Sequence, residues 1–248
     1  MILNKIMREK NKIIMLGDIH GEYSKARGDL KRLDVADCYL IQCGDFGIGF
    51  HSPNYYKHEL TLLNQELEKR NIHMYVVRGN HDSPEYFVQT NNPFDLNNIT
   101  LLADYSELDL LGQSFLFVGG AISIDRAFRV EGKSYWSDEE FVLKLEHEFP
   151  YKDRSYDVVV THTRPGVCGA FKGFDNIKYW TDQDFDLKND LIEEAQKLDY
   201  LYEKTKPKKW YYAHFHQSNI ITYEGTVFRC VDIDEYVEHT FDKLATLE

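Results

Sequence analysis

Cysteine is scarce in this chain of 248 residues, and long uninterrupted apolar runs are absent. The four cysteines form no Cys-x-x-Cys pair and no disulfide framework, which favours a reducing compartment. Cys38 and Cys43 are expected to be small buried residues. The longest uncharged apolar stretch, "SFLFVGGAISI", is too short to span a bilayer, and the charged N-terminus lacks a signal-peptide core. We therefore expect a cytoplasmic protein that has no membrane partner.

Positive charge is also scarce, because 29 basic residues stand against 41 acidic ones and give a formal net charge of −12. A field of that sign repels polyanions, so the composition argues against extended nucleic acid as a partner. The acidic excess has two explanations that composition leaves open. It either serves solubility or gathers carboxylates around a cation.

Short apolar runs alternate with amphipathic segments through the first third of the chain. Three runs are typical of buried strands: 12–17, 38–44 and 72–77. Apolar residues recur at helical spacing from Tyr23 to Leu33, and Ser52-Pro53 offers an N-cap and a first-turn proline for a second helix. This β-α-β-α-β order predicts a parallel central sheet that is buried on both faces.

The remainder of the chain is predicted to be richer in strands. A hairpin is expected about Leu111-Gly112, a helix over 137–149 from the capping-box pair Ser137 and Glu140, and another helix after Asp186. Further strands are predicted at "YDVVVTH", "KWYYAH", "NIITYEG" and "TVFRCVDID". No linker interrupts residues 1–248, which predicts a single domain. Two aperiodic segments, at about 120–136 and 163–185, are expected to be substrate-site loops.

Polar side chains with metal-binding or acid–base chemistry follow most of the predicted strands. They are Asp18, His20, Asp45, Asn80, His81, Asp82, His162, His214 and His216. Because the carboxyl ends of strands in an open α/β sheet converge, these side chains are expected to meet. In extended backbone, residues i and i+2 point the same way, so Asp18 with His20, and His214 with His216, could each bind one centre. Nitrogen and oxygen donors without thiolate suit Mn, Fe, Zn or Mg.

The series "GDIHG", "GDFG", "GNHD", "TH" and "HFH", between residues 17 and 216, resembles the calcineurin-like metallophosphoesterase superfamily. The resemblance implies an α/β fold, a four-layer β-sandwich of two mixed sheets flanked by helices. It also implies two divalent metal ions, with manganese the first expectation and Fe, Zn, Mg or Ni the alternatives. One ion would be held by Asp18, His20, Asp45 and His216. The second would be held by Asp45, Asn80, His162 and His214, with Asp45 bridging.

The implied activity is hydrolysis of phosphomonoester or phosphodiester bonds through a metal-bridging hydroxide. His81 matches the histidine that protonates the leaving group, and Asp82 beside it is a candidate to orient the imidazole ring. Four arginines are candidates to neutralise the phosphate of the ester substrate: Arg78, Arg126, Arg129 and Arg164. For each of them a salt bridge is the alternative.

Two departures from the family pattern limit the resemblance. Ile48 and Gly49 stand where the serine/threonine phosphatases have an Asp-Arg pair, and Ala213 replaces the usual glycine before His214. A non-catalytic scaffold on the same fold remains an alternative, as does a nuclease or cyclic-nucleotide phosphodiesterase. Scaffolds lose ligands or the proton donor, whereas every expected position is filled here. The other histidines are expected to be surface or packing residues: His51, His58, His73, His147 and His239.

Overall fold

The computed structural model describes residues 9–151, 154–169 and 177–241. The first sheet contains β11 (Tyr236–Glu238), β1 (Lys12–Leu16), β2 (Cys38–Gln42), β3 (His73–Val76) and β4 (Ile99–Leu101), in that order. The second sheet contains β5 (Ser106–Leu110), β6 (Gln113–Val118), β7 (Val158–Thr161), β8 (Lys209–Tyr212), β10 (Thr226–Cys230) and β9 (Asn219–Tyr223), in that order. Both sheets pair some strands in parallel and others antiparallel.

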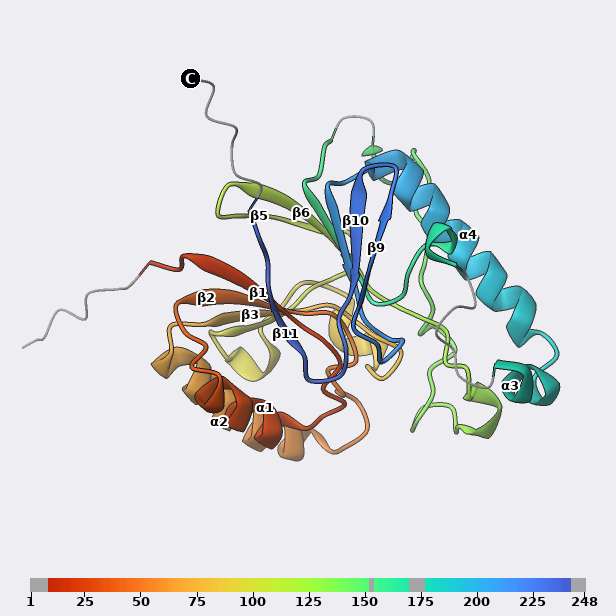
Figure 1. Cartoon of the computed structure of the whole chain (residues 1–248). Helices are drawn as coiled ribbons and strands as arrows, with labels where there is room; N and C mark the ends of the chain where they lie inside the picture. The colour runs from red at the N-terminus through yellow and green to blue at the C-terminus, as the bar shows by residue number, and fades with distance from the viewer. Residues whose placement is uncertain (1–8, 152–153, 170–176, 242–248) are drawn as a thin grey trace, which may run out of the picture.

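Helices cover the outer faces of the two sheets. The α-helices are α1 (Tyr23–Arg32), α2 (Pro53–Lys69), α3 (Ile177–Gln183) and α4 (Leu187–Thr205). Short 3-10 turns are η1 (Pro84–Phe87), η2 (Pro93–Asp95), η3 (Arg126–Phe128) and η5 (Gly166–Cys168). Figure 1 shows α1 and α2 along the first sheet and α4 along the second. The predicted mixed α/β sandwich with flanking helices is therefore confirmed. None of the described helices is both long and apolar enough to cross a bilayer.

The continuous apolar character of the strands follows from burial on both faces. Along β1, Ile13 and Met15 pack between the two sheets, whereas Ile14 and Leu16 face the core beneath α1 and α2. The parallel order of β1, β2 and β3 is as predicted. The four cysteines are free and buried, as the sequence suggested for Cys38 and Cys43. Apolar residues on both sides of β1 are needed because neither face of the sheet meets water there, whereas the edge strands β5 and β9 carry exposed residues.

Turn and cap chemistry accounts for several element boundaries. Ser52 accepts a hydrogen bond from the Tyr55 amide at the start of α2, as its N-cap position predicted. Leu111 and Gly112 both have positive φ, 54° and 77°, which matches the right-handed twist of the β5–β6 hairpin. The cap of α4 differs from the prediction, because Asp184 rather than Asp186 accepts hydrogen bonds from the first amides of the helix.

The predicted helix over 137–149 is wrong, since this segment runs as turns and irregular backbone. The guanidinium of Arg78 donates to the carbonyl oxygens of residues 138, 139 and 140, and the Phe141 amide donates to Glu194. These backbone groups would otherwise form the first helical turn. Tertiary partners therefore replaced a local pattern that was compatible with a helix, and Leu145 on its expected inner face is 45% exposed.

Glu194 on α4 provides a test of this arrangement. Burial raises its pKa to about 8, with Glu140 adding to the rise while the Phe141 and Ile122 amides oppose it. Between its ordinary pKa of 4.5 and about 8, the folded state holds a proton that the unfolded state releases, so the free energy of unfolding falls as pH rises. We expect Glu194→Gln to abolish this fall in the free energy of unfolding, which amounts to about 2–4 kcal/mol by pH 8.5.

Urea unfolding at pH 5 and pH 8.5 measures the effect. Glu193→Gln is the matched control, because that neighbouring carboxylate is largely exposed and pairs only with Lys197 among the described residues. An equal stability difference between Glu194→Gln and the parent chain at both pH values would contradict the prediction.

Candidate metal centre

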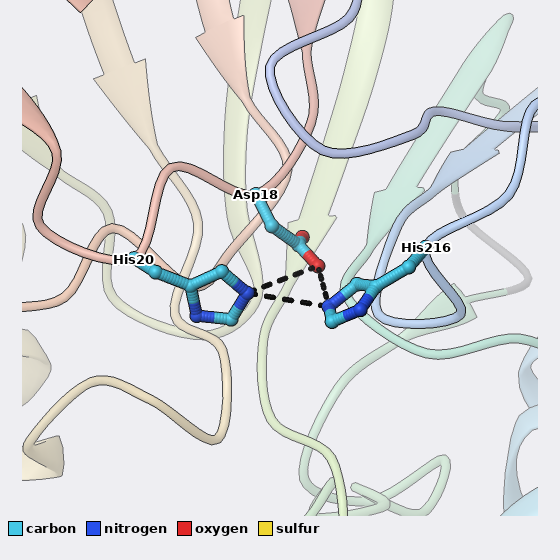
Figure 2. A group of neighbouring side chains, drawn as sticks. All are labelled: Asp18, His20 and His216. Carbon is cyan, nitrogen blue, oxygen red and sulfur yellow. Dashed lines mark hydrogen bonds and ion pairs between the residues drawn. The ribbon is translucent and has the colours of Figure 1, made fainter. Parts of the chain in front are cut away.

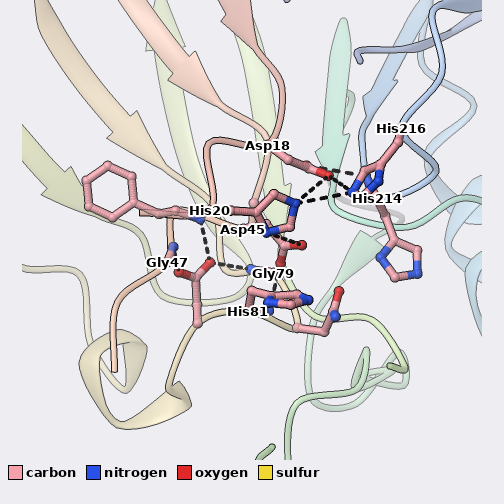
Figure 3. Close-up of polar contacts among 12 residues, drawn as sticks. Asp18, His20, Asp45, Gly47, Gly79, His81, His214 and His216 are labelled. Atoms are coloured by element: carbon pink, nitrogen blue, oxygen red, sulfur yellow. Dashed lines mark hydrogen bonds and ion pairs between the residues drawn. The ribbon is translucent and has the colours of Figure 1, made fainter. Parts of the chain in front are cut away.

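The loops that follow five strands bring the predicted ligands to one edge of the sandwich. β1, β2 and β3 of the first sheet and β7 and β8 of the second all end at this edge. Figure 3 shows the side chains from both sheets pointing into the space between these loops. Potential ligand atoms lie within 4.8 Å of one another in three overlapping groups: Asp18, His20 and His216; His20, Asp45 and His81; Asp45, His162 and His214.

The first group brings together residues that are far apart in sequence, Asp18 and His20 with His216 (Figure 2). His216 Nε2 lies 3.1 Å from Asp18 Oδ2 and 3.2 Å from His20 Nε2. His20 Nε2 is 3.9 Å from the same carboxylate oxygen. A cation bound at about 2.0–2.2 Å from each ligand holds the ligand atoms roughly 3–4.4 Å apart, depending on the angle between them, so this spacing suits a common cation. Asp18 Oδ2 is buried with no well-oriented donor among the described residues, which fits the same interpretation.

The group of Asp45, His162 and His214 lies deeper, and Asp45 links it to His20 of the first group. Asp45 Oδ1 is 3.1 Å from His162 Nε2, while its Oδ2 is 3.8 Å from His20 Nδ1. Asn80 Oδ1 lies 3.1 Å from the same nitrogen of His162. The carboxylate of Asp45 thus faces both groups, as a bridging ligand must. The side chains of Asp18, Asp45 and His162 are at most 2% exposed, whereas that of His216 is 47% exposed, so the site opens on one side.

The pKa values of Asp45 and His162 indicate that the buried end of the site favours a positive charge. Burial raises the pKa of Asp45, but His162, His81 and His20 outweigh it and hold that pKa well below its ordinary value. Burial lowers the pKa of His162, but Asp45 and Asp18 outweigh it and raise that pKa to about 9. Buried carboxylates are stable only beside cations or donors. A divalent metal at the same position would supply that charge.

Four of the candidate ligands have left-handed backbone, which no motif in the sequence predicts. The φ angles are 45° for His20, 58° for Asp45, 66° for His214 and 48° for His216. Such conformations cost energy outside glycine and concentrate at functional sites. Because these residues are not extended, the rule that residues i and i+2 point the same way does not hold for them. Asp18 and His20 do share a group, but His214 and His216 lie in different groups, as the family resemblance implied. Ala213 keeps a negative φ, so replacing glycine there costs nothing.

Close backbone packing fixes the orientation of His162. Its Nδ1 lies 2.8 Å from the Cys43 carbonyl oxygen, to which it can donate, and this leaves Nε2 facing Asp45 and Asn80. A Cβ added to Gly44 would lie 2.2 Å from His162 Nδ1, and Gly44 has a φ of +100°. The glycine is therefore required both by its conformation and by the closeness of the imidazole ring.

Asp82 does not contact the imidazole of His81, so the predicted orienting role is corrected. Its carboxylate accepts hydrogen bonds from four backbone amides, those of Phe46, Gly47, Ile48 and Gly79. Burial and the nearby Asp45 raise the pKa of Asp82 to about 7, against the effect of these amides. Asp82 ties together the loops that carry Asp45 and Asn80.

The four candidate arginines make different contacts in the structure, and three of them bind other parts of the protein. Arg78 is buried against Asp104 and the carbonyls of residues 138–140. Arg126 pairs with Asp184 and Asp190. Arg164 donates to the Gly169 carbonyl and lies 4.0 Å from the Phe215 ring centre. These contacts tie the three side chains to other parts of the protein, and their contact with phosphate stays a prediction.

Arg129 is the candidate arginine that reaches the site. Its Nη2 lies 2.8 Å from His81 Nε2, and its Nε donates to Asp125 at 2.6 Å. Burial lowers the pKa of His81 to about 4, Asp45 opposes this and Arg129 adds to it. His81 is therefore neutral at pH 7, and its Nε2 accepts a hydrogen bond from the guanidinium.

Two cavities meet at His81. The first, named the Trp180 cavity, has a volume of about 320 Å³ and is lined by Asp45, Asn80, His81, Ile124, Asp125, Arg129, Trp180, His214, Phe215, His216 and Gln217. The second, named the Phe50 cavity, has a volume of about 350 Å³ and is lined by His20, Gly21, Glu22, Gly47, Phe50, His51, Tyr55 and His81. Residues from both predicted loops line the Trp180 cavity, although positions 170–176 of the second loop lie outside the described residues.

Sequence reasoning missed the aromatic residues of these cavities. Phe50 stacks on His81 with ring centres 5.7 Å apart, and Trp180 stands edge-on to Phe128. His51, predicted to be a surface or packing residue, contacts Tyr55 in the Phe50 cavity. Phe128 and Trp180 lie in the two segments predicted as substrate-site loops, whereas Phe50 and His51 lie outside both of them. His239, by contrast, is a buried packing residue that hydrogen-bonds to Tyr211, as expected.

Solved structures align with this chain at low sequence identity. One superposes with a TM-score of 0.56 at 13% identity, covering 92% of this chain and 93% of that chain. The protein TT1561 of Thermus thermophilus aligns with a TM-score of 0.49 at 10% identity, covering 91% of each chain. Phosphopantetheinyl hydrolase from Mycobacterium tuberculosis aligns with a TM-score of 0.48 at 14% identity, covering 95% of this chain and 98% of that chain.

Sequence comparison identifies the family. No curated protein matches the chain by sequence. The profile of one family, described as calcineurin-like phosphoesterase, matches residues 11–218. That range contains every candidate ligand, and its fold and ligand groups agree with the motifs at the strand ends. This chain belongs to the calcineurin-like phosphoesterase family.

Proposed function

We propose that this protein hydrolyses phosphate esters at a centre of two divalent metal ions. The observation that carries the proposal is the convergence of the ligand atoms into three overlapping groups, in which His20 joins the first to the second and Asp45 joins the second to the third. Asp18, His20, Asp45 and His216 would hold one ion. Asp45, Asn80, His162 and His214 would hold the other. When bound, such ions supply a water of lowered pKa and positive charge for the phosphoryl oxygens.

In this proposal the chain's own residues orient the substrate and handle the proton. His81 lies where the two cavities meet, so an ester oxygen leaving from either cavity would depart next to its imidazole. An anionic phosphoryl group favours the protonated imidazole and offers Arg129 a stronger acceptor than His81 Nε2. Arg129 would therefore move to the phosphoryl group as substrate binds, and His81 would carry the proton for the leaving oxygen.

We infer further that a phosphodiester is the preferred substrate. A diester places two organic groups on phosphorus, and two cavities extend from His81, one beside His20 and the other beside His214. A monoester would fill only one of them. Trp180 and Phe215 line one cavity and Phe50 and Tyr55 line the other, which suits planar aromatic groups such as nucleosides.

Charge supports the same choice. Among the described residues, Arg129 is the one arginine or lysine that lines either cavity, and Asp125 pairs with it at 2.6 Å. Glu22 adds a further negative charge to the Phe50 cavity. A monoester dianion has one more charge to neutralise than a diester monoanion, and this surface offers little beyond the metals to do so. Esters that carry further phosphates are disfavoured for the same reason.

The test is hydrolysis of bis(p-nitrophenyl) phosphate and p-nitrophenyl phosphate by purified protein loaded with Mn²⁺. We expect both esters to be cleaved, with kcat/KM at least about 10-fold higher for the diester. Equal or reversed preference would overturn the inference about diesters alone. Failure to bind Mn²⁺, Fe²⁺ or Zn²⁺ with no hydrolysis of either ester would favour the non-catalytic scaffold.

Trp180→Ala should separate substrate contact from chemistry. Loss of the aromatic wall of the Trp180 cavity is expected to raise KM for the bis-ester by about 5–30-fold, which corresponds to about 1–2 kcal/mol of lost contact, with little change in kcat. Phe185→Ala is the control, since that aromatic side chain is 89% exposed and lines neither cavity. A fall in kcat at unchanged KM would contradict the assigned role.

A further inference from the structure

Ser123 and Glu139 form a buried chain of hydrogen bonds behind the candidate ligand Asn80. Asn80 Nδ2 donates to Ser123 Oγ at 3.0 Å, and the Ser123 amide donates to Glu139 Oε1 at 2.7 Å. Ser123 is 1% exposed and Glu139 is 2% exposed, so water does not replace these contacts. Neither residue belongs to any motif of the sequence.

The direction of these bonds decides which atom of the Asn80 amide faces the metal position. The Asn80 amide donates through Nδ2 to the Ser123 hydroxyl oxygen, and only the NH₂ end of the amide can serve that acceptor. The carbonyl oxygen Oδ1 is thereby left on the side of His162 Nε2, 3.1 Å away. Without this acceptor the amide could turn and present NH₂, which cannot bind a cation.

Arg78 holds the far end of this chain in place. Its Nη1 donates to the Glu139 carbonyl oxygen at 2.7 Å, and its Nη2 donates to Asp104 Oδ2 at 3.0 Å. The Ala121 amide donates to the same Glu139 carbonyl at 3.1 Å, which joins the Ser123 loop to this segment. A residue two positions before Asn80 thus determines where Glu139 lies.

We propose that Ser123 and Glu139 are positioning residues that fix the Asn80 amide with Oδ1 toward the second metal position. The inference rests on the proposed function, because it takes Asn80 as a ligand. Partners of this kind typically affect metal affinity by about 10–100-fold without touching the metal. They favour one of the two orientations of the Asn80 amide, and Ser123 is the residue that contacts this amide.

Mn²⁺ binding measured by isothermal titration calorimetry tests the proposal without relying on activity. We expect Ser123→Ala to weaken one of two Mn²⁺ sites by about 10–100-fold, with the other unchanged within about 3-fold. Glu139→Ala should weaken the same site by about 10-fold, because the Ser123 amide loses its acceptor Oε1, whereas Glu139→Gln keeps an acceptor oxygen and should keep most of the affinity. Ser123→Thr keeps the hydroxyl and should restore most of the affinity. Ser114→Ala, at a distant hydroxyl on β6, is the control.

A double-mutant cycle with Asn80→Ala distinguishes positioning from a general loss of structure. Once Asn80 is removed, Ser123→Ala should weaken Mn²⁺ binding by less than about 2-fold. Additive losses in the double variant, or unchanged affinity in Ser123→Ala, would overturn this inference while leaving the two-metal function intact. Absence of Mn²⁺ binding by the parent chain would overturn both. Thermal unfolding of each metal-free variant verifies that it folds.

Discussion

His81→Ala is expected to lower kcat for bis(p-nitrophenyl) phosphate by about 10²–10⁴-fold while leaving both metal ions bound. The imidazole lies where the two cavities meet and no second histidine lines both of them within the described residues. A leaving oxygen that departs without a proton must carry its full negative charge. The measurement is kcat at saturating ester together with the metal content of the same preparation.

The leaving group sharpens this prediction. p-Nitrophenolate is stable as an anion, so a diester whose two leaving groups are both poorer, such as diphenyl phosphate, should show the larger loss. His58→Ala is the matched control, because that histidine is on the outer side of α2 with its side chain 70% exposed. A His81→Ala protein that retained kcat for both kinds of ester would exclude His81 as proton donor. If it lost metal instead, His81 would be a ligand.

Asp45→Asn is expected to lower both metal content and activity. The carboxylate faces both ligand groups, and an amide supplies one neutral oxygen donor in place of two anionic ones. Stabilisation by the metals is worth several kcal/mol, so loss of either ion should lower kcat/KM by at least about 10³-fold. Elemental analysis after dialysis should find fewer than two ions per chain.

Asp34→Asn is a close control for this substitution. Asp34 also has left-handed backbone, with φ of 51° against 58° for Asp45, but its side chain is 97% exposed. Asparagine tolerates this conformation, so neither change introduces backbone strain. An Asp45→Asn protein that kept two tightly bound ions would contradict the bridging role. Loss of metal in Asp34→Asn would show that the effect does not depend on the bridging position.

Much of the fold was predictable because local pattern and tertiary environment agree there. The strands at β1, β2 and β3, and the helices with Tyr23 and Ser52 at their starts, follow from apolar runs and cap residues that the structure uses as predicted. The helix over 137–149 failed because Arg78 and Glu194 bind the backbone groups that a helix would need. A capping box is a local preference worth about 1 kcal/mol, and a buried guanidinium outweighs it.

The candidate site was predictable in its membership but less so in its internal roles. The candidate ligands could be found because they come directly after predicted strands, in loops that can carry polar side chains. Adjacency in sequence suggests that Asp82 orients His81, yet its buried carboxylate is surrounded by the amides of the loop after Asp45. Arg78 shows the same limit, since its partners lie 26 to 62 positions away in sequence. Pairing across such distances leaves no periodic signal.

The sequence by itself determined the family, the order of the first strands and helices, and the set of residues that could bind metal. These depend on residue type, period and short motifs, all of which are local. Only the tertiary structure decided which other side chains face one another: Arg129 lies against His81, and Ser123 lies with Glu139 behind Asn80. Those choices depend on left-handed turns and on contacts between the two sheets. A carboxylate or an amide acquires its role from the partners that folding places around it.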